Sequence, residues 1–428
     1  MSLKEQIKSD FNLYAQQANK DAFFEIRQNA FNEFSKSGLP TTHHEEWKYT
    51  NLRKIEEGNF TTSCTSTLDA ESLLNAGILN KINCNKIVFV NGCLFPELSV
   101  WLETDTQIIC TSISKARLEF QDLFLTHFGK YAKIEEGLNA MNTSIMSDGA
   151  FVFVPKGKQM QFPIMISNIT DAKEQPVLQQ PRNLIIIEDL AKATIIENYV
   201  AVGNHASFTN VVNEIFVGDN GSLEHYKVQR AKGETYHNNY TQIFQEANTH
   251  INQVTLTLDG QWVRNNLHFY MNGENCNSLL YGLYIPDGTQ FVDNHSRVDH
   301  AMPNCFSDEK YKGILKDKST AVFNGKIMVH LDAQKTNAYQ RNQNILLSNE
   351  ATVNTKPQLE IFADDVKCTH GATIGQLDEE PMFYLRSRGI SENEARKLLL
   401  NAFADDIAEK IKIPELVEIL EAEIERKL

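Results

Sequence analysis

The sequence predicts a mainly β protein, with a β-solenoid core flanked by helical regions. Residues 85–378 hold short apolar runs bounded by Asn, Asp or Gly, the pattern of short strands joined by turns. Turn residues recur in that region about every thirty residues, the kind of period typical of solenoids. Residues 1–84 and 379–428 instead show apolar residues at helical spacing. We therefore expect an N-terminal helical region, a β-helix core and a C-terminal helical region with these bounds.

The repeat in the core is an apolar pair that leads into an acidic or glycine-containing turn. Its turn residues are Asp189, Asp219, Asp259, Asp287, Asp317 and Asn349. Their spacings are 30, 40, 28, 30 and 32 residues, and Asn272-Gly273 supplies another turn within the series. Each coil of a solenoid buries the face of its neighbour, which keeps the period nearly constant. A β-sandwich would also give short strands, but with less constant spacing, so the pattern favours the solenoid.

The two ends carry helix signals. An aromatic and alanine stripe begins near Phe11 and stops at Ser37-Gly38-Leu39-Pro40, a glycine cap followed by proline. Near the other end, Ser391 and Glu394 form a capping box, and Pro414 starts a second helix. This C-terminal two-helix unit has too little apolar surface to be stable alone. It either packs on the rest of the chain or binds a partner.

Charge and hydropathy exclude several classes. Acidic residues outnumber basic ones by 55 to 41, a net charge of −14 that argues against nucleic acid as a partner. No apolar stretch reaches the roughly 18 residues that span a bilayer. The start of the chain lacks an apolar signal core, so we expect no membrane association and a cytoplasmic location.

Cysteines and catalytic motifs are uninformative. The seven cysteines contain no CxxC pair, which argues against a zinc ribbon, a thioredoxin-type pair or a self-contained cluster-binding run. We expect them to be buried and inert. The chain has no P-loop, no GxGxxG after a strand, no HExxH and no GxSxG. The sequence therefore predicts no catalytic constellation.

One candidate cluster contains His295, His300 and Cys305 at intervals of five. An odd interval on a strand places side chains on opposite faces, so the three converge only if a turn intervenes. Pro303 permits such a turn. Satisfied polar groups at a coil corner are nonetheless the favoured interpretation.

A second candidate is Cys368 with His370. Residues two apart on a strand share a face, about 6.6 Å apart along the chain. Thiolate and imidazole both suit iron, zinc or Fe–S species, and Lys367 could lower the thiol pKa. Two ligands make only half of a tetrahedral site. From these residues alone, a buried cysteine beside a structural histidine is favoured over a metal half-site.

Longer stretches resemble a known family. Between Asn294 and Gly389 the chain contains HSRVDHAMPNCFSDEKYKGIL, KTNAYQRNQNILLS, NTKPQLEIFADDVKCTHGATIG and FYLRSRGI, which resemble the SufB/SufD scaffolds of iron–sulfur cluster assembly. The similarity extends to EARKLLLNAFADDI and to the N-terminal EEWKYTNL. The SufB branch typically has HEAT where this chain has HGAT, so Gly371 replaces the SufB glutamate. The chain is therefore more similar to the SufD branch, and a stand-alone cluster-building role is in doubt.

The resemblance implies a right-handed parallel β-helix and a non-catalytic scaffold in an ATP-driven SUF complex. It implies pairing with a SufB paralogue through the β-helix and binding of the ABC ATPase SufC through residues near 385–428. A homodimer in isolation is also conceivable. The residues matching Cys368 and His370 would lie near the SufB–SufD interface and hold transient iron or a nascent Fe–S cluster. Reduced flavin is associated with such complexes, but no residue here identifies a flavin site.

Two other interpretations stay open. The chain could be a β-helix carbohydrate-active enzyme that uses an acidic groove with Asp364 and Asp365. It could also be a purely structural partner-binding protein in which Cys368 and His370 only pack.

Overall fold

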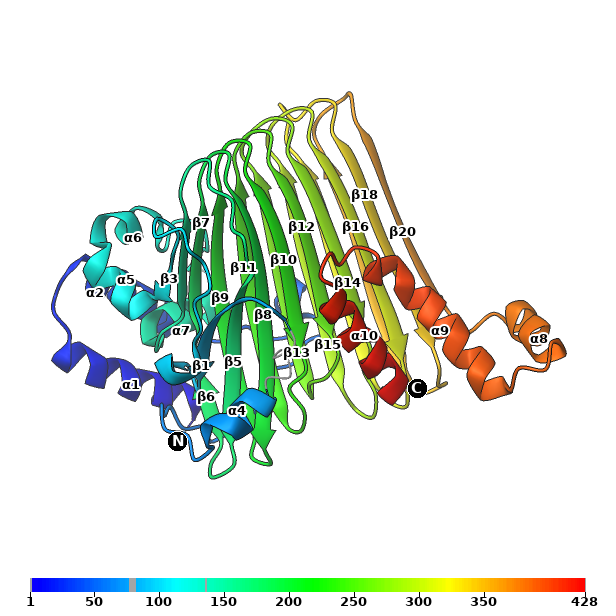
Figure 1. Ribbon diagram of the computed structural model, residues 1–428, viewed down its shortest axis with the longest axis horizontal. Helices are drawn as coiled ribbons and strands as arrows, with labels where there is room; N and C mark the ends of the chain where they lie inside the picture. Colours follow the sequence, from blue (N-terminus) through cyan, green and yellow to red (C-terminus); the bar gives the residue numbers. More distant parts are fainter. Residues whose placement is uncertain (1, 77–81, 135–136, 428) are drawn as a thin grey trace.

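Two long parallel sheets form the body of the molecule (Figure 1). The computed structural model describes residues 2–76, 82–134 and 137–427. Sheet I has the strand order β2-β1-β5-β8-β10-β12-β14-β16-β18-β20, and sheet II has the order β19-β17-β15-β13-β11-β9-β7-β4-β3. From β7 onward, successive strands of the chain alternate between the two sheets. The short β6 precedes β7 and pairs with β9 of sheet II. The fold is therefore a parallel β-solenoid, as the sequence predicts.

The solenoid strands have the following bounds. Sheet I contains β5 (Ile164–Ala172), β8 (Lys192–Gly203), β10 (Ser222–Gln229), β12 (His250–Thr257), β14 (Asn277–Tyr284), β16 (Phe306–Leu315), β18 (Asn337–Leu346) and β20 (Lys367–Gly375). Sheet II contains β4 (Ala150–Val154), β7 (Arg182–Ile187), β9 (Ser207–Val217), β11 (Thr235–Gln245), β13 (Trp262–Met271), β15 (Phe291–His300), β17 (Thr320–Val329) and β19 (Thr352–Ile361), with β6 at Val177–Gln179.

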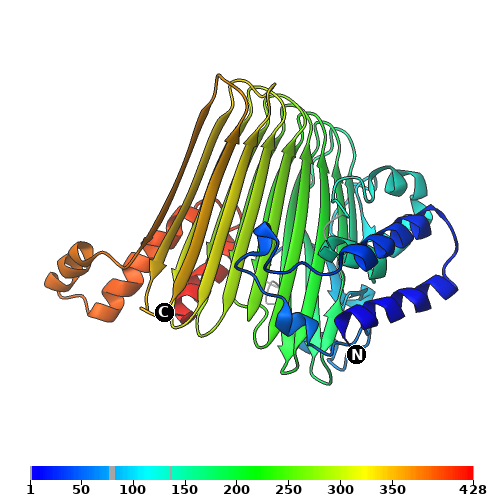
Figure 2. The ribbon, with the colours of Figure 1, turned by 180° about the vertical axis from the view of Figure 1, so that it is seen from behind.

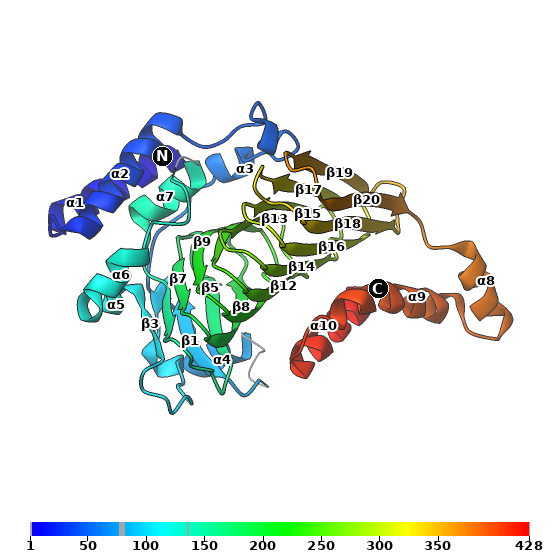
Figure 3. The same ribbon diagram turned by 90° about the horizontal axis from the view of Figure 1, so that it is seen from above.

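The elements that precede β4 lie at the first end of the solenoid and along the outer face of sheet II. They are α1 (Leu3–Gln17), α2 (Ala22–Ser37), η1 (Glu45–Trp47), α3 (Arg53–Glu56), α4 (Ala70–Ala76), β1 (Asn85–Val90), β2 (Cys93–Leu94), η3 (Pro96–Leu98), β3 (Ile109–Ser112), α5 (Ile113–Glu119), α6 (Gln121–His127) and α7 (Gly137–Ile145). The N-terminal helices lie against the outside of sheet II and this end of the solenoid (Figures 2 and 3). Three helices follow the last strand: α8 (Glu379–Ser387), α9 (Glu392–Ala408) and α10 (Pro414–Lys427). None of the helices in the described ranges is long and apolar enough to cross a bilayer.

The turn residues of the predicted repeat lie at two different corners of the solenoid. From β8 to β20, successive sheet I strands are in register at offsets of 30, 28, 27, 29, 31 and 30 residues. Asp189 and Asp219 lie where the chain passes from sheet II to sheet I, whereas the turn residues from Asp259 onward lie at the opposite corner. The irregular spacing of 40 marks the change from one corner to the other.

The sheet II to sheet I corner is a ladder of left-handed residues. Those with positive φ are Leu190, Asn220, Asn248, Asn275, Asn304 and Lys335. The backbone N–H of each donates to a carbonyl of the following coil, at 2.6–3.3 Å. Asparagine tolerates this conformation better than most residues, which explains its frequency at these turns.

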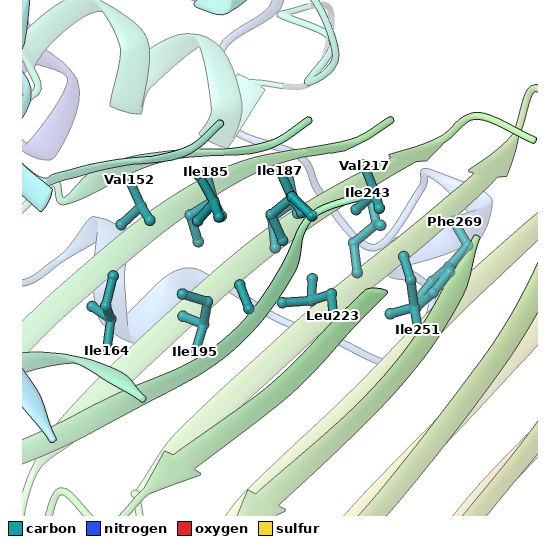
Figure 4. Packing of buried hydrophobic residues seen from close by; sticks show 14 of the residues in the cluster. Val152, Ile164, Ile185, Ile187, Ile195, Val217, Leu223, Ile243, Ile251 and Phe269 are labelled. Carbon is teal, nitrogen blue, oxygen red and sulfur yellow. The ribbon is translucent and has the colours of Figure 1, made fainter. Parts of the chain in front are cut away.

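The interior between the sheets changes character along the solenoid. In the first coils it is an aliphatic core built from inward-facing side chains of both sheets (Figure 4). The side chains in view include Val152, Ile164, Ile185, Ile187, Ile195, Val217, Leu223, Ile243, Ile251 and Phe269. Toward the last coils, inward positions become polar, as at Glu309, Gln340 and Asn342, which are all buried.

The C-terminal helices settle the packing question that the sequence left open. The second half of α9 and all of α10 pack on the outer face of sheet I, where Leu400, Ile407 and Leu420 join a cluster with strand residues such as Tyr226 and Leu256 (Figure 3). Polar contacts fix this docking: Lys312 Nζ donates to Asp406 at 2.6 Å, and Lys427 Nζ donates to the Ile285 carbonyl at 2.7 Å. Most of the unit therefore packs on its own chain.

The prediction of buried, inert cysteines holds for three of the seven; Cys110 and Cys368 are free but only partly buried, and the prediction is wrong for one pair. Cys84, Cys276 and Cys305 are buried and free, and burial raises the pKa of the Cys84 thiol to about 11. Cys64 and Cys93, however, form a disulfide that ties the segment before α4 to β2. They are 29 residues apart in the sequence and meet only because the chain folds back at the first end. No local sequence pattern predicts this fold-back.

Candidate functional site at the last coil

The last coil of the solenoid, β19 and β20, is open. Both strands end their sheets: β19 pairs with β17 and β20 with β18, and within the described ranges no strand pairs with their other edges. Neither strand contains a buried residue. An uncovered edge offers unpaired N–H and C=O groups to another chain.

Cys368 and His370 both lie on β20 and face the same side. They are in register with Ala338 and Gln340 of β18, which point into the solenoid. The two-residue spacing therefore places both side chains on one face of β20, as the sequence predicts. The side chains of these two residues continue the inward-facing row of β18 at the uncovered end of the solenoid.

The Cys368 thiol is half-buried. It packs against a small apolar cluster that includes Ile327 and Ala338. Burial raises the pKa of the thiol, and Lys367 does not offset this effect. The expectation that Lys367 lowers the thiol pKa is therefore wrong, because adjacent strand residues point to opposite faces. A metal ion would have to displace the thiol proton when it binds.

The His370 imidazole is exposed. Within the described chain it makes no hydrogen bond, ion pair or ring contact, and so both ring nitrogens are accessible from solvent. A histidine that fixes local structure normally bonds through one nitrogen, as His300 does to Ser307 Oγ at 2.9 Å. The environment of His370 is that of an available ligand.

A polar ladder runs inward from His370. Gln340 is its neighbour on β18, and Glu309 is the next residue along on β16. Gln340 Nε2 donates to Glu309 Oε2 at 2.8 Å. Burial raises the pKa of Glu309 to about 7, with no cation nearby to lower it. Burial therefore favours the protonated form of this carboxyl.

Sequence reasoning missed Glu309. The alternation in Phe306-Ser307-Asp308-Glu309 predicts that Ser307 and Glu309 share one face. Only the structure shows that this face is the buried interior, so the sequence held no signal that singles out Glu309.

The other candidate cluster does not converge. His295 lies on the outer face of sheet II, 3.1 Å from Asp293 Oδ1. His300 points into the interior, where burial lowers its pKa to about 3, and Cys305 lies at the corner with its thiol 3.4 Å from the Gly273 carbonyl. The predicted alternation thus separates the three residues. The favoured interpretation of satisfied polar groups is confirmed for Cys305, whereas His300 is bonded only through Nε2, and its buried Nδ1 has no hydrogen-bond partner among the described residues.

A complete metal centre is absent from the residues that the structure describes, where no three His, Cys, Asp or Glu side chains are placed to hold an ion. Cys368 and His370 supply two ligands at most. Asp364 and Asp365 are exposed on the turn before β20 and add no third ligand. Further ligands would have to come from the cargo, from solvent or from another chain.

Comparison with known proteins decides the family. The model "SUF system FeS cluster assembly, SufBD core domain" matches residues 168–403, and the SufBD N-terminal region matches residues 6–166. The chain belongs to the SufBD family. Among curated relatives, an iron–sulfur cluster assembly SufBD family protein of Synechocystis is 33% identical over 91% of this chain and 88% of its own. The SufD protein of Escherichia coli is 30% identical over 94% and 92%, and that of Bacillus subtilis 28% over 88% and 89%.

The SufBD core match extends beyond the solenoid into α9. The helix α8 and the start of α9 project beyond the last coil (Figure 1). Phe383, Tyr384 and Leu398 are 74%, 57% and 50% exposed there. Large apolar side chains gathered on one projecting element are typical of an interaction surface.

Proposed function

We propose that this SufBD-family chain is the SufD-type, non-catalytic scaffold subunit of a SUF complex. It pairs with a SufB paralogue through the open last coil, and His370 and Cys368 hold iron or a nascent cluster at the shared interface. The observation that carries the proposal is the placement of both residues on β20, an edge strand that pairs with β18 on one side only. SufD relatives that align over nine-tenths of the chain support the assignment.

The half-site fits this role. Two ligands from one edge strand leave coordination positions free, and a second edge strand brought alongside would supply the rest. A cluster held between two chains is released when they separate. Where no SufB is present, a second copy of this chain can take the same edge.

The ATPase partner is assigned to the exposed apolar residues of α8 and the first turns of α9. Three residues, 376–378, separate β20 from α8. A force applied to α8 on ATP-driven dimerisation of SufC is therefore transmitted directly to the strand that carries Cys368 and His370. The docked part of α9 and α10 anchors the rest of the helical region on sheet I. No flavin is assigned to this chain.

The test is His370→Ala in the anaerobically purified complex. We expect the subunits to associate as before, and iron–sulfur cluster content to fall by at least about tenfold, the loss that even an outer-shell metal partner can cause. Thr369→Ala is the matched control, because Thr369 is on the same strand but faces the other side. Normal cluster assembly by an intact His370→Ala complex would refute the ligand role. Failure to recover a SufB-type chain and an ABC ATPase with the wild type would refute the assembly.

A further inference from the structure

A cavity lies at the opposite end of the molecule from the last coil. It has a volume of about 470 Å³ and lies between the hairpin of α1 and α2 and the helices α5 and α7. Figure 3 shows these helices gathered at the end remote from β20. Ligand pockets typically span 300–1,000 Å³, so this one is of suitable size for a small metabolite.

Two arginines without carboxylate partners line this cavity. Arg27, on α2, is only 7% exposed, and its guanidinium lies 3.6 Å from the Tyr14 ring centroid. Its Nε donates to the Ser144 carbonyl at 2.9 Å. Arg117, on α5, lies 4.8 Å from the Phe23 ring. Across the described ranges, neither guanidinium has a carboxylate within 4.0 Å, the limit for an ion pair.

Arg27 differs in this respect from the other buried arginines, Arg182, Arg230 and Arg264, each of which has a carboxylate within 4.0 Å. Arg182 is paired with Glu214 at 2.6 Å, and Arg264 with Asp293 at 2.5 Å. Burial lowers the pKa of Arg27 to about 10; Tyr14 partly offsets this effect, and the positive charge of Arg117 adds a smaller decrease. A buried cation without a counter-ion is costly, and in a chain of net charge −14 carboxylates are plentiful. The missing negative charge is therefore best supplied by a ligand.

One carboxylate lies elsewhere on the cavity wall. Asp10 accepts hydrogen bonds from Gln6 Nε2 at 2.7 Å and Thr62 Oγ1 at 3.1 Å, and burial raises its pKa. With Asp10 ionised, the two arginines leave the lining with one net positive charge. The remaining wall is largely apolar and includes Phe23, Ile145 and Met146.

We propose that this cavity binds a small phosphate monoester, with the phosphate between Arg27 and Arg117 and the organic group against the apolar wall. A dianion neutralises both guanidiniums, and its tetrahedral oxygens match their fixed forks of N–H donors. A phosphate alone would leave most of the volume empty, whereas an attached organic group fills it. The ligand bridges α2 and α5 and so fastens the N-terminal hairpin to the solenoid. The proposal does not depend on the function proposed for the last coil.

The test is calorimetric titration of the full chain at low ionic strength with phenyl phosphate, inorganic phosphate and phenol. We expect saturable binding of phenyl phosphate, weaker binding of inorganic phosphate and none of phenol. Arg117→Gln should weaken phenyl phosphate binding at least about tenfold, because a charge-assisted pair to the phosphate is lost. Arg27→Lys, which keeps the charge but not the planar fork, should weaken it several-fold while the far-ultraviolet circular dichroism stays unchanged.

Lys115→Gln is the matched control. Lys115 is also on α5 but is paired with Glu119 at 3.7 Å and does not line the cavity. Binding in this variant should stay within about twofold of wild type, since a screened surface charge contributes little. Equal losses in Lys115→Gln and Arg117→Gln would show diffuse attraction and overturn the site. Absence of saturable phenyl phosphate binding would overturn it too, and equal affinity for inorganic phosphate would overturn the organic part of the ligand.

Discussion

The two ends of the solenoid are built from the same kind of coil but finished differently. At the first end, β5 and β7 are buried along their whole lengths, and helices cover the outer surfaces of the sheets. At the last coil, β19 and β20 contain no buried residue and have free edges. A stacked coil gains its stability from its neighbours, so an uncapped final coil is normally completed by another molecule. The difference is that the first end is closed by helices of the same chain, whereas the last coil is left uncovered by the residues that the structure describes.

The largest expected change in stability comes from a substitution at the first end, which helices close and which is called the closed end below. Arg182 and Glu214 form a fully buried ion pair, and Glu214 also accepts backbone N–H bonds from Gly129, Tyr131 and Ala132. Arg182→Met leaves that carboxylate buried without its cation. We expect the free energy of unfolding to fall by about 3–5 kcal/mol, measured by urea denaturation.

The corresponding pair at the open end is the control for that prediction. Arg341 lies on β18 and is 2.5 Å from Asp308, but its side chain is 47% exposed. Arg341→Met should cost no more than about 1 kcal/mol. Equal losses at both ends would mean that the two ends do not differ in stability as their burial indicates.

The next effect concerns Glu309, inside the solenoid near the open end. Its pKa is about 7 in the folded chain, against 4.5 for an ordinary glutamate. The folded state therefore holds the proton more tightly, and its contribution to stability is complete below about pH 4.5 and is lost as the pH rises to 7. Glu309→Gln should match wild type at pH 4 and exceed it by up to about 3 kcal/mol at pH 8. Parallel stability curves for the two proteins from pH 4 to 8 would refute the shift.

Much of the fold, and the faces on which several candidate residues lie, could be predicted from the sequence. The periodic turns predict the solenoid, and alternation correctly places Cys368 and His370 on one face and separates His295 from His300. The period alone could not distinguish the two corners, because both use Asp and Asn. The docking of α10 could not be predicted either, since it depends on sheet I residues more than a hundred positions away, such as Ile285 beneath Lys427.

The site itself was only half predictable. A two-residue spacing specifies a shared face, but the exposure of His370 follows from β20 being the last strand, which is a property of the whole fold. Glu309 lies two strands away, and its pKa depends on burial by the neighbouring coils. Such environments arise from long-range packing and leave little trace in local pattern.

Measuring how strongly the chain associates with a partner tests whether the free edge of β20 is a binding surface. Ile374, at the end of β20, is 47% exposed. Ile374→Lys should weaken association with the partner, or self-association in its absence, by at least about tenfold, equivalent to 1.4 kcal/mol. The stability of the isolated chain should change by less than about 0.5 kcal/mol, as for other surface positions.

Leu118→Lys provides the control for that measurement. Leu118 is 76% exposed on α5 at the closed end, where no partner is expected. Sedimentation velocity should show it associating like wild type. If Leu118→Lys disrupts association and Ile374→Lys does not, the assembling end is the other one.

The smallest effect is expected at Gly371, next to His370. A Cβ built there meets no atom within 4 Å, whereas one at Gly149, in the closed end, would lie 1.7 Å from the Arg182 carbonyl oxygen. Glycine inside a strand costs roughly 0.5–1 kcal/mol relative to alanine, so Gly371→Ala should stabilise the isolated chain slightly, by about 0.5 kcal/mol. Gly149→Ala should destabilise it, because backbone must move to make room. Thermal unfolding of the two variants measures the contrast, and a loss of stability in Gly371→Ala would mean that the last coil is covered within the chain itself.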